Sequence, residues 1–254
     1  MNTVIDGIKI NYIDEGSGDV IVLLHGWASN IKLFDSMIHA LKDTYRVIAL
    51  DMPGFGESGE LAEPWCVDDY VDYVVKFMKS LGLTKISLLG HSFGGRVIIK
   101  MINRYKEDFE YTSVILTDAA GIRPKRTMKQ KMKVRMFKIA KKVFSIPLLD
   151  KMYPGFVENM RKKNGSADYN NATPVMRNTL VKVVNEDLSH LICGISCPAL
   201  LIWGENDTAT PLSDGEFMEK EIKDSALIVV KGAGHFAFLE QAGYVNSVIK
   251  AFLK

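Results

Sequence analysis

The ten residues LLGHSFGGRV, at positions 88–97, place a serine where an apolar run gives way to a segment of helical period. A tight turn from a strand into a helix forces the side chain at its tip outward, and small neighbours such as Gly90 and Gly94 let the two elements approach closely. The first turn of the helix also offers free N–H groups, which favour developing negative charge. We therefore predict that Ser92 is a nucleophile.

Short apolar runs alternate with segments of helical period on both sides of this junction. Nearly continuous apolar runs are typical of parallel strands that are buried on both faces. Such strands are expected at 20–24, 45–50, 85–90, 113–118, 199–204 and 226–230. Helical spacing predicts helices over 68–81, 97–105 and 244–253. The alternation predicts an α/β fold, with a mostly parallel sheet and helices on both faces. The opening segment IKINYID, residues 8–14, is expected to form an antiparallel edge hairpin with the strand at Val20.

A serine hydroxyl needs a base to take its proton, and that base needs a carboxylate to orient it. His235 directly follows the last predicted strand, which brings it to a carboxyl end beside Ser92. Asp207 lies in the loop after the preceding strand, and it completes the chain order serine, aspartate, histidine. Asp118, at the end of another strand, is the competing acid; Glu205 is weaker because it sits closer to its strand. We predict that Ser92, Asp207 and His235 form a catalytic triad.

Acyl transfer through a serine also needs N–H donors for the oxyanion of the tetrahedral intermediate. The N–H of Phe93, the residue after the nucleophile, is one expected donor of this oxyanion hole. The motif HGW at 25–27 follows the strand 20–24 and supplies the second donor, the N–H of Trp27. His25 is expected to hold this loop by hydrogen bonding, beside the substrate pocket.

The alternation of strands and helices breaks between residues 122 and 190. We expect this segment to be a helical cap, or lid, inserted into an α/β core made of residues 1–121 and 191–254. Met128, Met132 and Met136 begin one apolar helical face of the segment. They are expected to pack the cap onto the core, or to roof a hydrophobic substrate pocket.

The same segment is strongly basic, with ten Lys and Arg residues and no acid between Arg123 and Lys142. One interpretation is a solvated helical face with lysines over apolar stems. The other is that the segment attracts an anionic substrate or partner, such as a carrier protein or an anionic lipid surface. The sequence leaves both open.

Global composition argues against several classes of function. Of the 254 residues 47% are apolar and 24% are charged, and the formal net charge of +2 gives no reason to expect nucleic-acid binding. The start of the chain lacks a secretory leader, and no apolar stretch approaches the roughly 20 residues that span a bilayer. The three cysteines show neither metal spacing nor a paired framework. We expect a cytoplasmic protein with no transmembrane segment, no metal and no other cofactor.

Five motifs, HGW, DMPGFGES, GHSFGG, WGENDTATP and GAGHFAFLEQ, together resemble the α/β-hydrolase superfamily in its lidded, single-domain branch. The resemblance covers residues 1–121 and about 191–254, and it implies an eight-stranded sheet with a helical cap. The motifs are similar to those of bacterial carboxylesterases such as the pimeloyl-carrier-protein methyl esterases. Haloalkane dehalogenases and epoxide hydrolases are disfavoured, because those families use an aspartate where Ser92 stands. By the same resemblance Asp51, in DMPGFGES, anchors a turn.

The expected activity is hydrolysis of a small carboxylic ester or thioester through an acyl-enzyme, and the basic cap raises the prospect of an anionic or carrier-bound ester. The same residues also suit a carbon–carbon bond hydrolase, an acyltransferase, or a ligand receptor with weak turnover. The cap matches no motif, so the acyl and leaving groups are not predicted.

Overall fold

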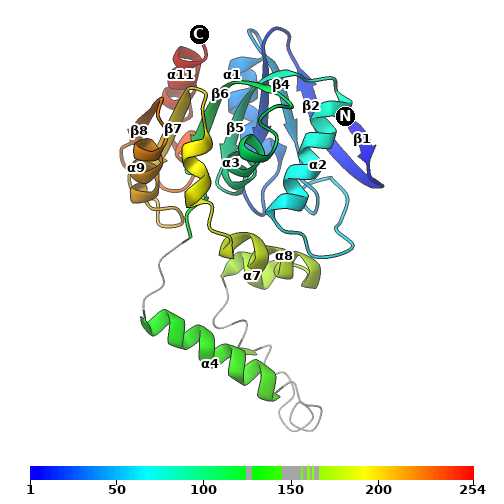
Figure 1. The fold of residues 1–254 in the computed structure, drawn as a ribbon, viewed down its shortest axis with the longest axis vertical. Helices are drawn as coiled ribbons and strands as arrows, with labels where there is room; N and C mark the ends of the chain where they lie inside the picture. Colours follow the sequence, from blue (N-terminus) through cyan, green and yellow to red (C-terminus); the bar gives the residue numbers. More distant parts are fainter. Residues whose placement is uncertain (124–127, 145–155, 157–158, 161, 163–165) are drawn as a thin grey trace.

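An eight-stranded sheet forms the centre of the molecule (Figure 1). The structure is a computed structural model, which describes residues 1–123, 128–144, 156, 159–160, 162 and 166–254. The strands are β1 (Asn2–Ile5), β2 (Ile8–Glu15), β3 (Val20–Leu24), β4 (Arg46–Leu50), β5 (Lys85–His91), β6 (Glu110–Thr117), β7 (Ala199–Gly204) and β8 (Ser225–Val230). Their order is β1-β2-β4-β3-β5-β6-β7-β8. All pairs from β4 to β8 are parallel, which confirms the predicted mostly parallel sheet.

The start of the chain pairs differently from the expected hairpin between residues 8–14 and the strand at Val20. β2 pairs antiparallel with β1 on one side and with β4 on the other. β3 has no free edge for β2, because β4 and β5 occupy both of its edges. The turn from β1 to β2 is Asp6 and Gly7, with φ of 49° and 80°, as two-residue hairpin turns of this kind require. The predicted hairpin partner was therefore wrong.

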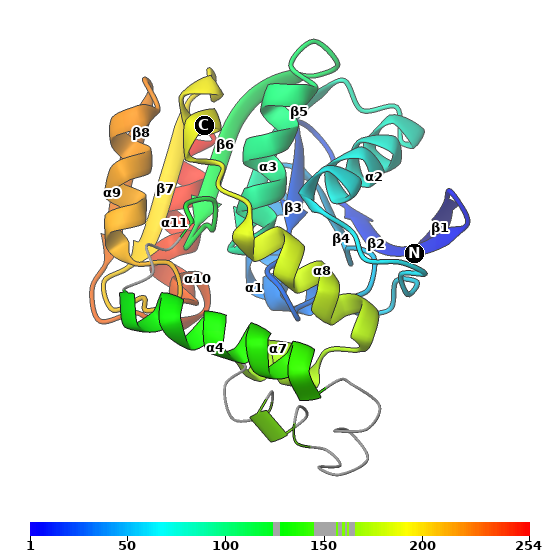
Figure 2. The same ribbon diagram turned by 60° about the horizontal axis from the view of Figure 1, so that its bottom comes forward.

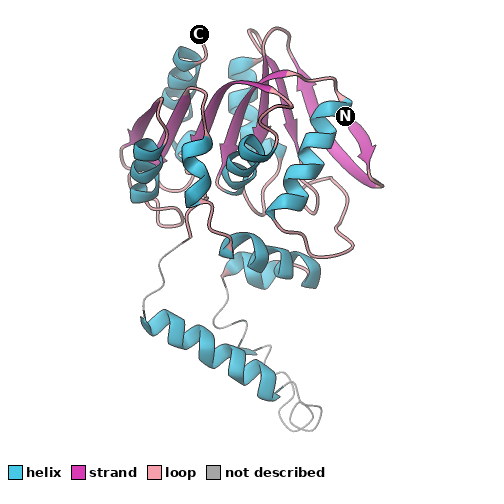
Figure 3. Cartoon of the chain, in the orientation of Figure 1, coloured by secondary structure: helices cyan, strands magenta, loops and turns pink. Residues whose placement is uncertain are grey.

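Helices cover both faces of the sheet (Figure 3). One face carries α2 (Val67–Ser80), α3 (Phe93–Arg104), the 3-10 helix η2 (Ser189–Gly194) and α9 (Leu212–Glu221). The other face carries η1 (Ile31–Phe34), α1 (Asp35–Leu41), α10 (Ala237–Glu240) and α11 (Ala242–Phe252). Each face is closed by its own cluster of buried apolar side chains. Within the described residues, no helix combines the length and apolarity needed to cross a membrane.

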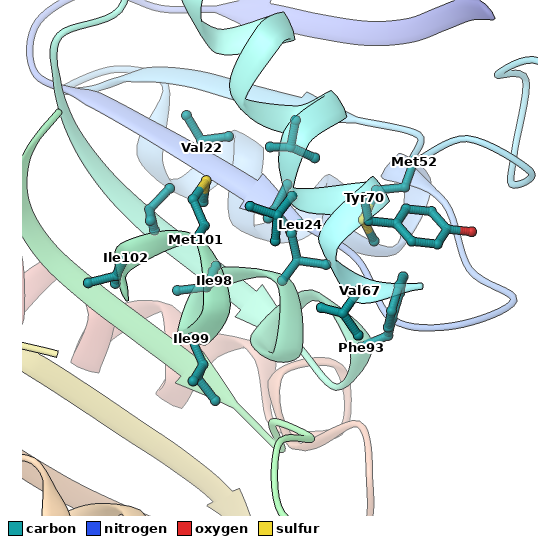
Figure 4. Packing of buried hydrophobic residues seen from close by; sticks show 14 of the residues in the cluster. Val22, Leu24, Met52, Val67, Tyr70, Phe93, Ile98, Ile99, Met101 and Ile102 are labelled. Atoms are coloured by element: carbon teal, nitrogen blue, oxygen red, sulfur yellow. The ribbon is translucent and has the colours of Figure 1, made fainter. Parts of the chain in front are cut away.

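The larger cluster holds the first residue of α3 in place. Val22 and Leu24 of β3 pack with Val67 and Tyr70 of α2 and with Phe93 of α3 (Figure 4), and each is at most 3% exposed. Burying an apolar side chain of this size contributes about 1.5–3 kcal/mol. The residue that precedes Phe93 therefore sits on a rigid support.

The segment between β6 and β7 contributes α4 (Met128–Phe144), α7 (Ala167–Asn171) and α8 (Pro174–Asn185) among the described residues. Helix α8 buries Met176 and Val183 in the larger core cluster. The end of α8 is tied to α3, because the Arg96 guanidinium donates to the Glu186 carbonyl at 2.7 Å and Lys100 pairs with the Glu186 carboxylate. In both Figure 1 and Figure 2, α8 lies between α3 and α4.

The methionine stripe of α4 does not occupy the expected position. Met128, Met132 and Met136 are 75%, 65% and 63% exposed. The aromatic residues of α4 lie on another face, where the Phe144 ring packs against Phe156 with centroids 4.2 Å apart. Because an aromatic ring buries more apolar area than a methionine, this face is the favourable one to cover. The prediction that the three methionines pack on the core or line a substrate pocket does not hold in this structure.

Candidate active site

Ser92 sits at the junction of β5 and α3 with a strained backbone. Its φ is 49° and its ψ is −110°, a conformation that costs a non-glycine residue about 1–3 kcal/mol and persists only when its surroundings impose it. Here the Ser92 N–H donates to the Thr117 carbonyl at 3.2 Å, and the Ser92 carbonyl accepts from Gly95 and Ala120 at 3.0 and 2.9 Å. These three backbone hydrogen bonds fix the turn and therefore the direction of the hydroxyl.

Glycines let three backbone segments meet around this turn. A Cβ at Gly94 would lie 2.0 Å from the Leu24 carbonyl oxygen, and a Cβ at Gly90 would lie 2.8 Å from the Gly94 carbonyl carbon. A Cβ at Gly26 would lie 3.3 Å from Cβ of Ser92. The loop after β3 therefore packs directly against the serine, and only a residue without a side chain fits at these contacts.

The structure brings Ser92, His235 and Asp207 together in one hydrogen-bonded array. His235 Nε2 lies 3.0 Å from Ser92 Oγ, and His235 Nδ1 lies 2.8 Å from Asp207 Oδ2. The other carboxylate oxygen, Oδ1, accepts from the backbone N–H groups of Ala209 and Thr210 at 2.7 and 3.0 Å. The histidine side chain is 21% exposed and the aspartate side chain is fully buried. The array thus runs from a solvent-reachable hydroxyl to a buried carboxylate.

The surroundings of Asp207 favour its ionised form. Burial acts to raise the pKa of the carboxyl, but hydrogen bonds from His235 and Thr210 outweigh burial and hold this pKa below its ordinary value. A carboxylate that accepts from Nδ1–H leaves Nε2 of the histidine unprotonated and facing the serine hydroxyl.

Asp118, the competing acid, is bonded to backbone groups instead. Its Oδ1 accepts from the Gly204 N–H at 2.7 Å and its Oδ2 from the Ala237 N–H at 3.1 Å. This carboxyl therefore ties the end of β7 to the start of α10, on either side of the histidine loop. Glu205, the weaker candidate, is exposed and accepts from the Gly232 N–H at 2.9 Å. Neither side chain takes the place at the histidine that Asp207 occupies.

Ionisation of Asp118 should make stability depend on pH. Burial raises the pKa of this carboxyl from 3.8 to about 7, against the lowering effect of its two backbone hydrogen bonds. Asp207 and His235 act on it as nearby charges. The unfolded chain ionises at the ordinary value, so the contribution to stability is complete below pH 3.8 and is lost as pH rises through about 7.

The variant Asp118→Asn lacks this titration. The free energy of unfolding of the wild type minus that of the variant should therefore fall between pH 4 and 7, by at most about 4 kcal/mol. Urea unfolding at a series of pH values measures this difference. A difference that stays constant over that pH range would contradict the raised pKa of the Asp118 carboxyl.

Thr210 is a part of the array that the motifs did not indicate. Its hydroxyl lies 2.7 Å from Asp207 Oδ2, 3.0 Å from the Asp118 carbonyl oxygen and 3.3 Å from His235 Nδ1. The hydroxyl has one proton, and the shortest contact assigns it to the Asp207 carboxylate. The sequence near Asp207 did offer a signal for Thr210, since a polar residue three positions after an aspartate suits an Asx-type turn.

Two further histidines support the site through backbone contacts. His91 Nε2 donates to the carbonyl of His235 at 2.9 Å, and burial lowers the pKa of the His91 ring to about 3. His25 is fully buried; its Nδ1 bonds the Gly26 carbonyl at 2.7 Å and its Nε2 accepts from the Met52 N–H at 2.9 Å. His25 therefore holds its loop, as predicted, but with no exposed surface it does not line a substrate pocket.

The loop that carries Trp27 borders a cleft of about 320 Å³. The Trp27 ring contacts the rings of Phe55 and Phe93, with centroids 4.8 and 5.5 Å apart. The opposite wall comes from α7 and α8, including Met176, which approaches the backbone of Gly54. In the part of the chain that the structure describes, neither the Trp27 N–H nor the Phe93 N–H donates a hydrogen bond. The described residues also hold no cluster of side chains that suits a metal ion.

A second loop, which contains Gly54, Phe55 and Gly56, also lines this cleft, and Asp51 holds it in place. Its Oδ1 accepts from the Ile31 N–H at 2.7 Å, and its Oδ2 accepts from the Glu57 N–H and the Asn11 amide, each at 2.8 Å. This confirms that Asp51 anchors a turn.

Residues 19–141 match the family model described as the alpha/beta hydrolase fold, and residues 179–254 match a model described as TAP-like protein. The chain belongs to the α/β-hydrolase superfamily. One relative of this α/β hydrolase is the AB hydrolase superfamily protein YisY of Bacillus subtilis, at 26% identity over 94% of this chain and 93% of that protein. A second is a pimeloyl-[acyl-carrier protein] methyl ester esterase of Neisseria meningitidis, at 26% identity over 92% of this chain and 93% of that protein.

Solved structures agree with the fold of this α/β hydrolase. A bromoperoxidase from Bacillus anthracis superposes with a TM-score of 0.77 at 24% identity, over 97% of this chain and 95% of that chain. A meta-cleavage product hydrolase from Pseudomonas fluorescens superposes with a TM-score of 0.73 at 25% identity, over 100% of this chain and 97% of that chain. The chain is accordingly an α/β-hydrolase enzyme.

Proposed function

We propose that this α/β hydrolase cleaves a carboxylic ester through an acyl-enzyme, with Ser92 as nucleophile, His235 as general base and Asp207 as orienting acid. The observation that carries the proposal is the unbroken array from Ser92 Oγ to His235 at 3.0 Å and from His235 to Asp207 at 2.8 Å. The array starts at a residue whose φ of 49° is imposed by its surroundings. A strained, preorganised hydroxyl next to an oriented imidazole is the arrangement that activates a serine.

The first half of the reaction forms the acyl-enzyme. His235 Nε2 takes the proton of Ser92 Oγ as the oxygen attacks the ester carbonyl carbon, and the carbonyl oxygen becomes an oxyanion. The imidazolium is stabilised by the buried Asp207 carboxylate. His235 then gives the proton to the leaving alkoxide, the carbon–oxygen bond breaks, and the alcohol departs.

The oxyanion is proposed to accept from the N–H groups of Trp27 and Phe93. Two observations support this pair: both N–H groups lack a hydrogen bond within the described residues, and Gly26 packs the Trp27 loop against Ser92. The Phe93 N–H also belongs to the first turn of α3, where the helix field favours negative charge. Each such donor typically contributes about 100-fold to 1000-fold in rate.

The second half of the reaction returns the serine. Water enters where the alcohol left, His235 Nε2 takes one of its protons, and the hydroxide oxygen attacks the acyl carbon. The second oxyanion collapses, the bond to Ser92 Oγ breaks, and the serine oxygen regains its proton from His235. The products are a carboxylic acid and an alcohol.

Residues 122–190 are proposed to act as a cap over this site, with α7 and α8 as its inner wall. The cleft beside Trp27 supports this, because α7 and α8 form the wall opposite the Trp27 loop. Phe55, Met176 and Trp27 add apolar side chains to the lining of the cleft, which suits the acyl or alcohol part of a small ester. An anionic or carrier-bound ester stays a prediction from the basic segment.

A fluorophosphonate probe tests the proposed nucleophile. The probe should form a phosphorus–oxygen bond with Ser92, release fluoride, and label one peptide that contains this serine. The variant Ser92→Ala should not be labelled, and His235→Ala should be labelled far more slowly because no base takes the hydroxyl proton. Labelling at another residue, or equal labelling of Ser92→Ala, rejects the assignment.

Carbon–carbon bond hydrolysis is the second candidate, because a meta-cleavage product hydrolase superposes over the full length of this chain. In that reaction the leaving group is a carbanion, so the enzyme must deliver a proton to carbon before the carbon–carbon bond breaks. Comparison of kcat/KM for a series of p-nitrophenyl esters of increasing chain length with kcat/KM for a vinylogous 1,5-diketone separates the two. A higher kcat/KM for the diketone would replace the ester proposal.

A further inference from the structure

Helix α4 presents an apolar stripe to solvent along its whole length. Five side chains form the stripe, with exposed fractions of 75% for Met128, 65% for Met132, 63% for Met136, 52% for Ile139 and 40% for Val143. At 100° per residue these positions fall within roughly 80° of the helix circumference, and the helix is roughly 25 Å long. Isolated exposed apolar residues are ordinary, but a continuous stripe of this kind marks a surface that meets another apolar phase.

Positive charges flank this stripe on both sides. On the helical wheel, Arg135, Lys138 and Lys142 lie along one flank and Lys133 lies along the other, and all four are exposed. Among the residues that the structure describes, none of the four pairs with a carboxylate. The sequence of α4 contains no acid at all. The face therefore combines an apolar centre with an uncompensated cationic border.

The composition of the face favours a lipid surface over a protein partner. Protein docking sites are centred on aromatic and Arg anchors in pockets, whereas the stripe of α4 consists only of Met, Ile and Val. The aromatic residue Phe144 lies on a different face, against Phe156. An amphipathic helix with cationic borders lies in the plane of a membrane interface, where the apolar face enters the acyl boundary and the cations meet anionic headgroups.

We propose that α4 docks this protein on an anionic phospholipid surface, with the Met128–Val143 stripe inserted at the interface and the flanking cations at the headgroups. The stripe supplies the apolar contribution, and each Lys or Arg adds an electrostatic contribution that anionic lipid selects. The site around Ser92 takes no part in this contact, so docking is independent of the proposed reaction. In Figure 1, α4 lies at the end of the molecule away from the sheet.

Vesicle co-sedimentation of the full chain tests the proposal. Vesicles of phosphatidylcholine with an equal part of phosphatidylglycerol should bind the protein, and vesicles of phosphatidylcholine alone should bind it at least about tenfold more weakly. Added salt should weaken the binding. The variant Lys138→Glu/Lys142→Glu should lower the affinity at least about tenfold, because it replaces two attractive charges by two repulsive ones. Met132→Gln/Met136→Gln, which changes no charge, should also lower the affinity about tenfold.

Matched variants distinguish docking through α4 from general attraction. Lys106→Glu/Lys223→Glu changes the net charge equally at exposed positions elsewhere, and Val4→Gln alters an apolar residue that is 63% exposed, as Met136 is. Both controls should bind as the wild type does. Circular dichroism and turnover of a soluble ester verify that each variant is folded. Absence of binding to anionic vesicles, or equal losses in the controls, overturns the proposal; so does binding to polyglutamate without binding to vesicles, which would indicate an acidic protein partner.

Discussion

Replacing Ser92 by alanine is expected to lower kcat for ester hydrolysis by about a million-fold, as removal of a serine nucleophile does in a protease of this mechanism. Under the proposed mechanism the acyl-enzyme forms on Ser92 Oγ, because His235 Nε2 lies 3.0 Å from this oxygen. The residual rate should come from binding and the oxyanion donors alone. Steady-state turnover of the p-nitrophenyl ester that the wild type hydrolyses fastest measures the loss.

The control for this variant is Ser80→Ala, at the end of α2; among the described residues, the Ser80 hydroxyl donates only to the Phe77 carbonyl. Its kcat should equal that of the wild type. A Ser92→Ala variant that keeps kcat within tenfold of the wild type would show that another group attacks the ester.

Replacing Asp207 by asparagine is expected to lower kcat by about 10⁴-fold. The amide presents an N–H or a neutral oxygen to His235 Nδ1, so the imidazole loses both its fixed tautomer and the charge that stabilises the imidazolium. The pKa of the Asp207 carboxyl lies below its ordinary value, so the wild type carries this charge at neutral pH and the variant does not. The loss should fall on kcat, with KM for a small ester little changed.

Two further variants serve as comparisons for Asp207→Asn. Asp118→Asn should reduce stability more than turnover, because its carboxyl holds the backbone of Gly204 and Ala237 rather than the histidine ring. Thr210→Ser keeps the hydroxyl that bonds Asp207 Oδ2 and should retain most of the activity. If Asp118→Asn lost more turnover than Asp207→Asn, the acid of the array would be Asp118.

The sequence alone does not decide which aspartate orients His235. Asp118 and Asp207 both follow a buried strand, and both strands end at the same edge of the sheet, so chain position leaves two candidates. Only the folded loops separate them: Asp207 turns toward His235 Nδ1, while both oxygens of Asp118 bond backbone N–H groups. The His91 contact with the His235 carbonyl and the Thr210 contact with the Asp118 carbonyl were missed for the same reason, because each joins residues that lie far apart in the sequence.

The sequence likewise predicts where most strands lie but not how all of them pair. The apolar runs indicate β3 to β8 correctly, because a strand that is buried on both faces must be apolar at nearly every position. The pairing of β2 with β4 depends on which edges stay free after the sheet assembles. The turn at Asp6 and Gly7 was a local signal for the β1–β2 hairpin, since Asp-Gly supplies two residues that tolerate positive φ.

The glycine-flanked serine at 88–97 by itself determined the nucleophile candidate, and the order of the later motifs determined its histidine partner. These are local facts, since a strand, a turn without side chains and a helix create the elbow from neighbouring residues. Tertiary structure alone decided which carboxylate reaches the histidine and that the methionine face of α4 points to solvent. Both depend on which surfaces meet after folding, and the amphipathic period of a helix does not say what its apolar face will contact.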